Sequence, residues 1–301
     1  MVTPAHILMC PPDFYGIEYE INPWMDRRRQ VDHELAVRQW AELRGLLEAS
    51  GALISCLPPV RGLPDLVFTA NMALICHDLA VPAQFRHAER QQEEALTGPW
   101  LAAHGFELRP LTCGACFEGA GDALFCGETL FAGYRIRSDI RGHQEIGELL
   151  RCHVIPLELV DHRYYHLDTC FCPLAPGVAI YYPPAFDAYA LDVLRARVDD
   201  LIPVSDDEAQ HFACNAVVLG TTVITNRGCP KLHRHLQLRG FTAKECPLSE
   251  FVKAGGSAKC LTLRLDGEDA ATWKVAECLG QCSQRPTVCT ATPTVPTDEK
   301  P

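Results

Sequence analysis

Short apolar runs alternate with amphipathic stretches along most of the chain. Residues 29–50 predict a helix, because the apolar residues at positions 35, 36, 40, 43 and 47 follow helical spacing and Gly51 fits a helix end. Residues 52–57 form a short apolar run that predicts a strand. A helix followed by a strand is therefore expected near the start of the chain, and this order recurs further along.

Residues 72–111 contain one complete unit of the pattern. Two short apolar runs on either side of the turn residues His77 and Asp78 predict a hairpin. A charged helix is expected over 86–104, and a returning strand over 106–111. The same order of strand, strand, helix and strand returns three more times. The further hairpins are expected at 123–133, 170–182 and 216–226, the helices at 138–151, 187–198 and 230–239, and the closing strands at 153–159, 201–204 and 241–246.

A fifth unit is divided between the two ends of the chain. Residues 261–265 predict its first strand, and residues 7–10 predict the second, ahead of the helix and strand described above. A repeat completed in this way closes a ring and avoids exposed sheet edges. We therefore predict an α/β fold, a five-bladed α/β propeller of strand-strand-helix-strand repeats. An ordinary α/β sheet with coincidental spacing is the alternative, although hairpins within each unit disfavour a parallel, doubly wound sheet.

Five short polar motifs stand just before the first strand of each unit. Their anchors are Asn71, Asp122, Asp168, Asn215 and Cys260, and successive anchors differ by 51, 46, 47 and 45 residues. Self-similarity at such a period indicates a repeat architecture. In a ring of repeats, equivalent strand starts meet near the axis. A carboxylate, a histidine and a cysteine far apart in the sequence would then share one pocket.

The length and composition of the chain permit a sizeable core, in one large domain or two. The chain has 301 residues, of which 48% are hydrophobic. We assign residues 1–282 to a single catalytic propeller domain. Residues 283–301 are dominated by proline and threonine without periodicity, which predicts a disordered tail.

The charge and the apolar pattern argue against several classes of partner. The net charge of −11 disfavours nucleic acid and an anionic membrane surface. No apolar run approaches the ~20 residues of a membrane helix, and the first ten residues lack the features of a secretory signal. We therefore expect a cytoplasmic protein whose partner is a small molecule. The sequence leaves the oligomeric state open, a homo-oligomer included.

The sixteen cysteines do not predict a disulfide scaffold, because no secretory signal precedes them. Cys113-x-x-Cys116 has half of a zinc-knuckle spacing, and no second pair follows at a suitable distance. His162-x-x-x-His166 lacks the glutamate of the metalloprotease motif. We expect neither a metal nor another cofactor, and most of the cysteines are interpreted as small buried hydrophobic residues.

Three of the motif residues suit covalent chemistry. Cys260 follows a glycine-rich segment that leaves room around a thiol, and a thiolate becomes reactive when its pKa is depressed or a base is near. His166 and Asp168 alternate, so on a strand both would point the same way. Each residue also has a plain structural interpretation, as a buried cysteine at a strand edge and as a surface histidine with a hydrogen-bonded neighbour.

Other polar residues could orient or bind a charged group. Glu118 and Asp122 flank a Gly-Ala-Gly segment, which fits a pair of carboxylates for a histidine or a cation, or else a polar turn. Asn71 ends an apolar strand approach, where asparagine is usually a turn former. Arg90 and Arg137 could bind a carboxylate by a bidentate contact, although most arginines are solvated surface residues.

Together these motifs resemble the guanidine-modifying enzymes of the pentein superfamily, over about residues 5–265. That superfamily includes arginine deiminases, dimethylarginine dimethylaminohydrolases, amidinotransferases and arginine dihydrolases. The arginine dihydrolase type is the most similar, on Cys-Pro-Pro-Asp-Phe-Tyr from Cys10, Ile-Asn-Pro-Trp-Met from Ile21 and Phe-Thr-Ala-Asn ending at Asn71. The resemblance implies the propeller fold and a hydrolase that acts on the guanidinium of arginine through a covalent cysteine thiouronium intermediate.

The same resemblance implies roles for eight residues. Cys260 is the expected nucleophile, His166 the expected general acid and base, and Glu118 the carboxylate that orients the histidine. The expected substrate-binding residues are Asp168 and Asn71 at the guanidinium, Arg90 and Arg137 at the α-carboxylate, and Asn22 in the pocket wall.

Asn71 bears on the choice among activities. Deiminases carry an aspartate at this position, so the clamp around the guanidinium has one negative charge fewer in this chain. We therefore predict an arginine dihydrolase, which converts arginine to ornithine, ammonia and carbon dioxide. The alternatives are a dimethylarginine dimethylaminohydrolase or an arginine deiminase, which give citrulline, and an amidinotransferase, which needs an amine acceptor. A rival of another class is a non-catalytic propeller that acts as a binding module, as the ribosome anti-association factor of this architecture does.

Overall fold

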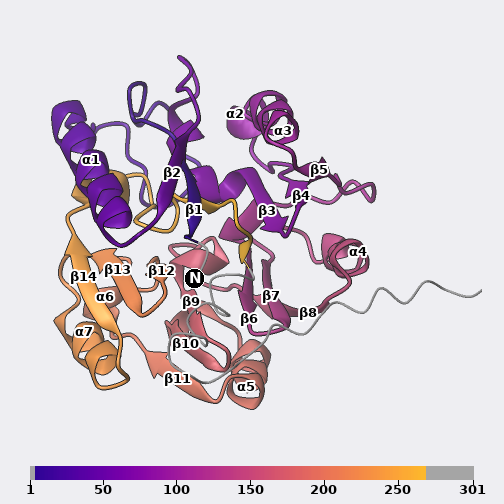
Figure 1. Ribbon diagram of the computed structural model, residues 1–301, viewed down its shortest axis with the longest axis vertical. Helices are drawn as coiled ribbons and strands as arrows, with labels where there is room; N and C mark the ends of the chain where they lie inside the picture. Colours follow the sequence, from indigo (N-terminus) through magenta and orange to yellow (C-terminus); the bar gives the residue numbers. More distant parts are fainter. Residues whose placement is uncertain (1–3, 269–301) are drawn as a thin grey trace, which may run out of the picture.

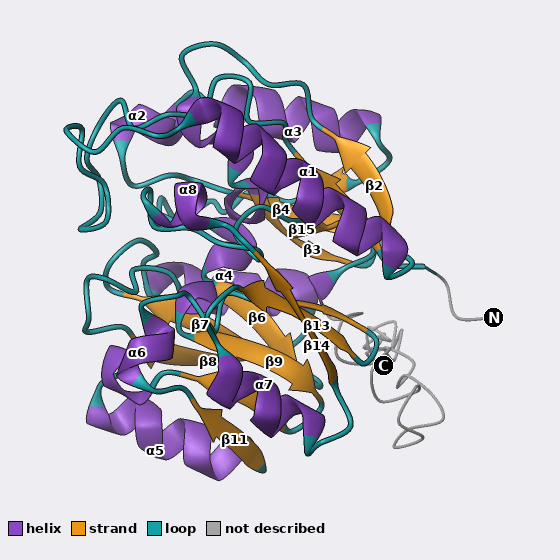
Figure 2. Cartoon of the chain, turned by 90° about the vertical axis from the view of Figure 1, so that its left-hand side faces the viewer, coloured by secondary structure: helices purple, strands orange, loops and turns teal. Residues whose placement is uncertain are grey.

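Five three-stranded sheets surround a central axis in the computed structural model, which describes residues 4–268 (Figure 1). Each sheet is one blade, and helices lie on the outside of the sheets (Figure 2). The propeller predicted from the repeats is confirmed. The predicted tail at 283–301 lies outside the described residues.

Each blade has the same internal connectivity. Its first two strands are antiparallel, and its third strand runs parallel to the second after a helical connection. Four blades are continuous in sequence: β3 (Ala73–Cys76), β4 (Leu79–Pro82) and β5 (Glu107–Leu108); β6 (Ala123–Cys126), β7 (Thr129–Tyr134) and β8 (His153–Glu158); β9 (Phe171–Ala175), β10 (Val178–Tyr181) and β11 (Asp200–Pro203); β12 (Val217–Leu219), β13 (Thr222–Asn226) and β14 (Thr242–Cys246). The helices are α1 (His33–Ala49), α2 (Ala88–Gln91), α3 (Glu94–Ala103), α4 (Arg141–Leu150), α5 (Ala188–Arg197), α6 (Asp206–Ala209), α7 (Pro230–Gln237) and α8 (Ser249–Val252).

The fifth blade joins segments from opposite ends of the described chain. It consists of β15 (Leu263–Arg264), β1 (His6–Met9) and β2 (Leu53–Cys56). β1 pairs antiparallel with β15, with Leu8 opposite Leu263, and parallel with β2. Both edges of β1 are therefore paired, and the split repeat closes the ring as the sequence predicted.

The strands nearest the axis are buried on both faces. Every residue of β3, β6 and β9 is buried, whereas β8 at the outside of its blade alternates between buried and partly exposed positions. A strand covered on both faces has no polar side, which explains why the inner strands are continuous apolar runs in the sequence.

The first helix confirms the amphipathic pattern. α1 buries Ala36, Trp40, Leu43 and Leu47, and the Asp32 side chain caps its first turn by accepting a hydrogen bond from the Leu35 N–H. The helix begins four residues later than the pattern suggested. No helix within residues 4–268 has the length and apolar character that crossing a membrane requires.

The largest difference from expectation lies at 86–104, where two helices replace one. The break between α2 and α3 falls at Gln92 and Glu93. Glu93 is fully buried, and both of its carboxylate oxygens accept hydrogen bonds from Arg90 at 2.8 Å. This buried pair occupies the segment where the helix was expected to continue. The returning strand β5 is also shorter than predicted.

Candidate active site

Three of the predicted motifs form short 3₁₀ turns that lead into the inner strands. η2 (Thr69–Met72), η3 (Gly119–Gly121) and η4 (Leu167–Thr169) precede β3, β6 and β9, and neighbouring turns contact one another. Four predicted site residues in or next to these turns, and Cys260 before β15, are buried. Each has at most 2% of its surface exposed: Asn71, Glu118, His166, Asp168 and Cys260.

Glycines in η3 allow the turns to approach this closely. Gly119 has a φ of +60°, and a Cβ on it would lie 2.8 Å from the Ala73 backbone. A Cβ on Gly121 would lie 2.2 Å from the Asn71 side-chain nitrogen. Neither position tolerates a larger residue without movement, so the Gly-Ala-Gly segment is needed to bring η2 and η3 together.

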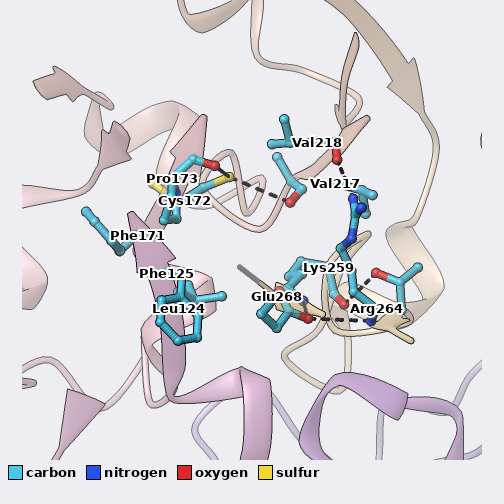
Figure 3. Close-up of a pocket in the computed structure, with 13 residues that line it drawn as sticks. Leu124, Phe125, Phe171, Cys172, Pro173, Val217, Val218, Lys259, Arg264 and Glu268 are labelled. Atoms are coloured by element: carbon cyan, nitrogen blue, oxygen red, sulfur yellow. Dashed lines mark hydrogen bonds and ion pairs between the residues drawn. The ribbon is translucent and has the colours of Figure 1, made fainter. Parts of the chain in front are cut away.

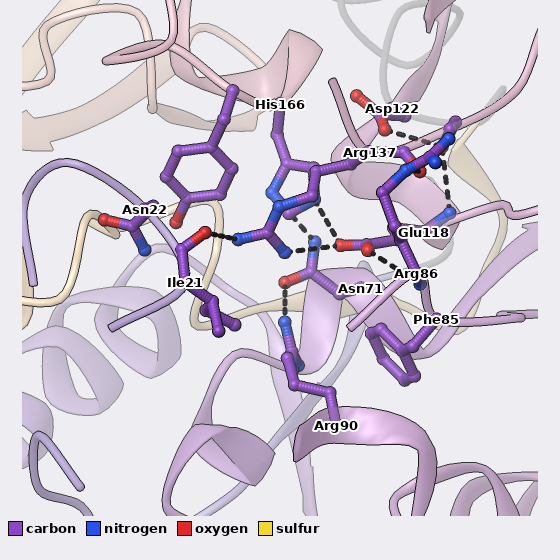
Figure 4. Close-up of polar contacts among 12 residues, drawn as sticks. Ile21, Asn22, Asn71, Phe85, Arg86, Arg90, Glu118, Asp122, Arg137 and His166 are labelled. Atoms are coloured by element: carbon purple, nitrogen blue, oxygen red, sulfur yellow. Dashed lines mark hydrogen bonds and ion pairs between the residues drawn. The ribbon is translucent and has the colours of Figure 1, made fainter. Parts of the chain in front are cut away.

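His166, Glu118 and Arg137 form a buried chain of charged contacts (Figure 4). His166 Nε2 lies 2.7 Å from Glu118 Oε2, and Arg137 Nη1 donates to the same oxygen at 3.0 Å. Burial opposes ionisation of Glu118, but the charges of Arg137 and His166 outweigh it and hold the pKa of the carboxyl well below its usual range. The ionised carboxylate accepts a hydrogen bond from Nε2–H, so Nδ1 is the ring nitrogen that remains for proton transfer.

Arg137 is itself held on three sides. Its Nη2 donates to the Ile21 carbonyl at 3.1 Å, and its guanidinium lies 4.5 Å from the centre of the Tyr165 ring. The charge therefore contacts Glu118, a loop carbonyl and an aromatic face. These contacts connect the loop at Ile21 to the His166–Glu118 pair, as Figure 4 shows.

Asp122 supports the same arrangement from behind. Ser138 Oγ donates to Asp122 at 2.6 Å and accepts a hydrogen bond from the Glu118 N–H at 3.0 Å. Asp122 also accepts a hydrogen bond from the Leu167 N–H at 3.0 Å, next to His166. Burial raises the pKa of Asp122 to about 6. Asp122 thus positions the backbone at Glu118, through Ser138, and the backbone next to His166, at Leu167, rather than contacting the imidazole.

Arg90 anchors the Asn71 amide. Arg90 Nη1 donates to Asn71 Oδ1 at 2.8 Å (Figure 4). Its Nε and Nη2 donate to Glu93. Because its oxygen faces Arg90, the Asn71 amide points its nitrogen toward His166, whose Nδ1 lies 3.5 Å away. Arg90 is therefore bound by protein groups in this structure, and its predicted contact with a substrate carboxylate stays a prediction.

Cys260 lies beside Asp168. Cys260 Sγ is 3.4 Å from Asp168 Oδ2 and 3.7 Å from Oδ1. Burial and the neighbouring carboxylate raise the pKa of the Cys260 thiol well above its usual range. Burial also raises the pKa of Asp168 to about 7, against the charge of Lys259. Without a bound cation, this pair favours a neutral thiol that donates to the carboxylate.

The cysteine group and the histidine group adjoin each other. Asp168 follows His166 by two residues in the same turn, and the Ala70 N–H, next to Asn71, donates to the Cys260 carbonyl at 3.2 Å. The fold thus gathers five predicted site residues in one region at the start of the inner strands: Asn71, Glu118, His166, Asp168 and Cys260.

The remaining predicted residue, Asn22, comes from the loop before α1. Its Nδ2 donates to the Ala254 carbonyl at 3.0 Å, and its Oδ1 accepts a hydrogen bond from the Trp24 N–H at 3.0 Å. Gly255 approaches Asn22 so closely that a Cβ there would lie 2.9 Å from the Asn22 oxygen. Asn22 therefore ties this loop to the segment that leads to Cys260.

Sequence reasoning missed three buried polar residues. Asn215 was recognised as a motif anchor, but not as a partner of Cys260, whose sulfur lies 3.1 Å from its Nδ2. Glu93 binds Arg90 three residues earlier, a helical spacing that could have indicated it. Asp65 is also buried, and burial raises the pKa of its carboxyl against the charge of Arg90 and a hydrogen bond from the Tyr19 hydroxyl.

A separate small cavity lies between the inner strands (Figure 3). It has a volume of about 40 Å³, and its lining includes the buried ion pair of Lys259 and Glu268, whose Nζ and Oε1 are 2.7 Å apart. The cavity is too small for an amino acid, and none of the eight predicted site residues lines it. It is therefore distinct from the predicted site, although Lys259 directly precedes Cys260.

Within residues 4–268, no three His, Cys, Asp or Glu side chains are grouped so that they could hold a metal ion. Cys113 is exposed and Cys116 is partly exposed, and both are free thiols.

Comparison with known proteins agrees with this fold. The family model for eukaryotic N,N dimethylarginine dimethylhydrolase matches residues 18–265. The bifunctional arginine dihydrolase/ornithine cyclodeaminase ArgZ of Synechocystis sp. is 45% identical over 270 residues, which cover 88% of this chain and 38% of ArgZ. The N(G),N(G)-dimethylarginine dimethylaminohydrolase of Mycobacterium tuberculosis is 41% identical over 257 residues, which cover 85% of this chain and 84% of that protein.

Solved structures show the same relationship. The N-terminal domain of ArgZ, as a cysteine-to-serine mutant bound to substrate, superposes with a TM-score of 0.85 at 44% identity, covering 87% of this chain and 98% of that chain. An asparagine-to-serine mutant of that domain, covalently bound to a reaction intermediate, gives a TM-score of 0.84 at 44% identity, covering 87% and 97%.

The fold and the comparisons define a five-bladed α/β propeller of the pentein type. Within that class, the chain belongs to the N,N dimethylarginine dimethylhydrolase family. It spans only 38% of the length of the bifunctional relative ArgZ.

Proposed function

We propose that this protein is a hydrolase that acts on the guanidinium of arginine through a covalent intermediate on Cys260. The observation that carries the proposal is the buried Asp168 carboxylate beside the Cys260 sulfur, with the Glu118-bound His166 in the adjoining turn. A cationic, planar group bound by Asp168 would bring its central carbon within reach of the sulfur. The ArgZ domain bound to substrate, at 44% identity, supports the same assignment.

The charges around the site match the parts of an amino-acid substrate. Asp168 and Asn71 are suited to the guanidinium, while Arg90 and Arg137 are the candidates for the α-carboxylate and Asn22 for the pocket wall. A bound guanidinium also neutralises Asp168 electrostatically, which lowers the pKa of the Cys260 thiol and favours the reactive thiolate.

The first half of the reaction removes one nitrogen. His166 Nδ1 takes the thiol proton from Cys260, and the thiolate attacks the guanidinium carbon. The imidazolium, stabilised by Glu118, then passes the proton to the departing nitrogen, so that ammonia leaves and a thiouronium adduct remains. His166 next takes a proton from water, the hydroxide attacks the carbon, and the carbon–sulfur bond breaks to give a ureido product. General acid–base catalysis of this kind typically contributes ~10²–10⁴-fold.

Asn71 supports a second round on the ureido product. A ureido group is neutral, so one carboxylate and an amide suit it better than two carboxylates. The thiolate would attack the ureido carbon and release a second ammonia, and water would then cleave the thiocarbamate to a carbamate. The carbamate loses carbon dioxide and leaves ornithine. One arginine and two waters thus give one ornithine, one carbon dioxide and two ammonia.

Product stoichiometry from L-arginine tests the proposal. We expect two ammonia for each ornithine, no free urea, and no turnover by the Cys260→Ser variant. Accumulation of citrulline with one ammonia would reduce the activity to that of a deiminase. A Cys260→Ser protein that keeps its function unchanged would instead favour a non-catalytic binding module.

The second candidate is a dimethylarginine dimethylaminohydrolase, which the 41% identity to the Mycobacterium tuberculosis enzyme favours. The two activities are separated by comparing kcat/KM for arginine and for N(G),N(G)-dimethylarginine. Release of dimethylamine with higher kcat/KM than for arginine would establish this alternative.

A further inference from the structure

The Asn215 side chain uses its full hydrogen-bonding capacity inside the site. Its Nδ2 lies 3.1 Å from Cys260 Sγ and donates to the Asp168 carbonyl at 3.1 Å. Its Oδ1 accepts hydrogen bonds from the N–H groups of Ser257 and Cys260, both at 3.1 Å. Asn215 is completely buried, so these four partners complete its two donor and two acceptor positions.

We propose that Asn215 stabilises the Cys260 thiolate by donating a hydrogen bond to its sulfur and, through the same amide, fixes the distance between Cys260 and Asp168. This inference rests on the proposed role of Cys260 as the nucleophile. It adds a residue that acts on the sulfur itself, beyond the histidine, the glutamate and the guanidinium clamp.

The surrounding backbone determines which end of the amide faces the sulfur. Two N–H groups point at Oδ1, and a rotated amide would direct its own N–H groups at them. The nitrogen must therefore face Cys260. Because an amide nitrogen only donates, the sulfur must act as the acceptor, and a thiolate accepts a hydrogen bond more strongly than a thiol.

Asn215 acts against the other side chain that contacts the sulfur. The Asp168 carboxylate lies 3.4 Å from Sγ and disfavours a negative charge there, whereas the amide donor favours it. Burial removes water that would otherwise solvate the thiolate, so a fixed donor has a large effect. The titratable groups that act on Cys260 or on its Asp168 partner come from several elements: Asp168 and Tyr165 near η4, Cys170 and Cys172 near β9, and Lys259 and Glu268 beside β15.

The same amide also joins two segments that must keep their spacing. Asp168 belongs to η4, whereas Ser257 and Cys260 belong to the turn before β15. Asn215 contacts both from the turn before β12, and the Lys259 N–H donates back to the Asn215 carbonyl at 3.3 Å. The position of the sulfur relative to the carboxylate therefore depends on Asn215.

The test measures the reactivity of the Cys260 thiol without using turnover. Folded protein is treated with iodoacetamide across pH 6 to 10, and alkylation of the peptide that contains Cys260 is followed by mass spectrometry. The variant Asn215→Ser removes the donor to sulfur without adding charge. Asn226→Ser is the matched control, because Asn226 is another buried asparagine whose amide binds the backbone at His211, Arg227 and Leu248.

We expect both variants to lose similar thermal stability, with only Asn215→Ser shifting the alkylation profile to higher pH. A shift of about one pKa unit would slow alkylation about tenfold below the midpoint. With arginine, kcat should fall at least tenfold while KM changes less. Asn215→Asp keeps both acceptor bonds but turns an oxygen toward the sulfur, so it should shift the alkylation profile to still higher pH. It takes the place of the serine variant if that variant does not fold.

Coincident alkylation profiles for wild type, Asn215→Ser and Asn226→Ser would overturn the role of Asn215. Failure of the proposed function looks different. In that case the wild type would not hydrolyse arginine, yet the alkylation profiles would still separate the two asparagine variants.

Discussion

The His166 imidazole lies 2.7 Å from the Glu118 carboxylate, and both are almost completely buried. Because Arg137 keeps the carboxylate ionised, Glu118 can stabilise an imidazolium. Glu118→Gln keeps the shape but removes the charge, so we predict that kcat for arginine falls about 10²-fold with a smaller change in KM. Steady-state kinetics well below the melting temperature measure this effect. Glu128→Gln, at an exposed turn, is the control, and a loss of kcat under threefold in Glu118→Gln would contradict the prediction.

Asn71 is predicted to decide where the reaction stops. Asn71→Asp keeps an oxygen for Arg90 but adds a second carboxylate at the guanidinium site. A neutral ureido group should then react poorly, so citrulline should accumulate from arginine and ammonia release from added citrulline should fall at least tenfold. Chromatography of the products gives the ratio of citrulline to ornithine. An unchanged ratio would show that this position does not select the product.

Asp168 is predicted to lower the stability of the ligand-free protein at neutral pH. Burial raises its pKa from 3.8 to about 7, so between these values the folded state holds a proton that the unfolded state has lost. The raised pKa therefore costs no free energy of unfolding below pH 4. The free energy of unfolding then falls as the pH rises through 7, by at most about 4 kcal/mol in total. Asp168→Asn should therefore gain stability relative to wild type over that range, while it loses binding of arginine. Denaturant unfolding at pH 5 and pH 8 measures the gain, and an equal difference at both values would refute it.

His143 is predicted to contribute to acid unfolding. It lies in α4 with 5% of its surface exposed, so its ring is almost completely removed from water. Burial lowers its pKa from 6.5 to about 4, so the unfolded state binds a proton first. Its stabilising effect is complete above pH 6.5 and declines toward pH 4, by at most about 3 kcal/mol.

The test for His143 is the pH dependence of unfolding. His143→Leu removes the titrating ring, so its free energy of unfolding should fall less than that of wild type between pH 7 and pH 4. His104→Leu, at an exposed helix end, serves as the control and should follow the wild type. Parallel curves for wild type and His143→Leu would count against the assignment.

The sequence predicted the features that repeat and missed those that depend on a single tertiary contact. Inner strands, hairpin turns and the split blade follow from apolar runs and turn residues, so their bounds agree within a few positions. The break at Glu93 could not be predicted, because it depends on the Arg90 side chain turning inward to reach Asn71. For the same reason Asn215 was visible as a repeat anchor, while its contact with Cys260 required the distance between two blades.

The closing strand has a consequence for how the protein is made. Cys260 precedes β15 by three residues, and β15, the last strand in sequence within residues 4–268, pairs with β1 to close the ring. A ribosome finishes the other four motifs before it reaches this cysteine. The nascent chain therefore cannot present its sulfur in a finished pocket until the first and last blade segments have met, so partly synthesised chains are expected to be inert toward arginine.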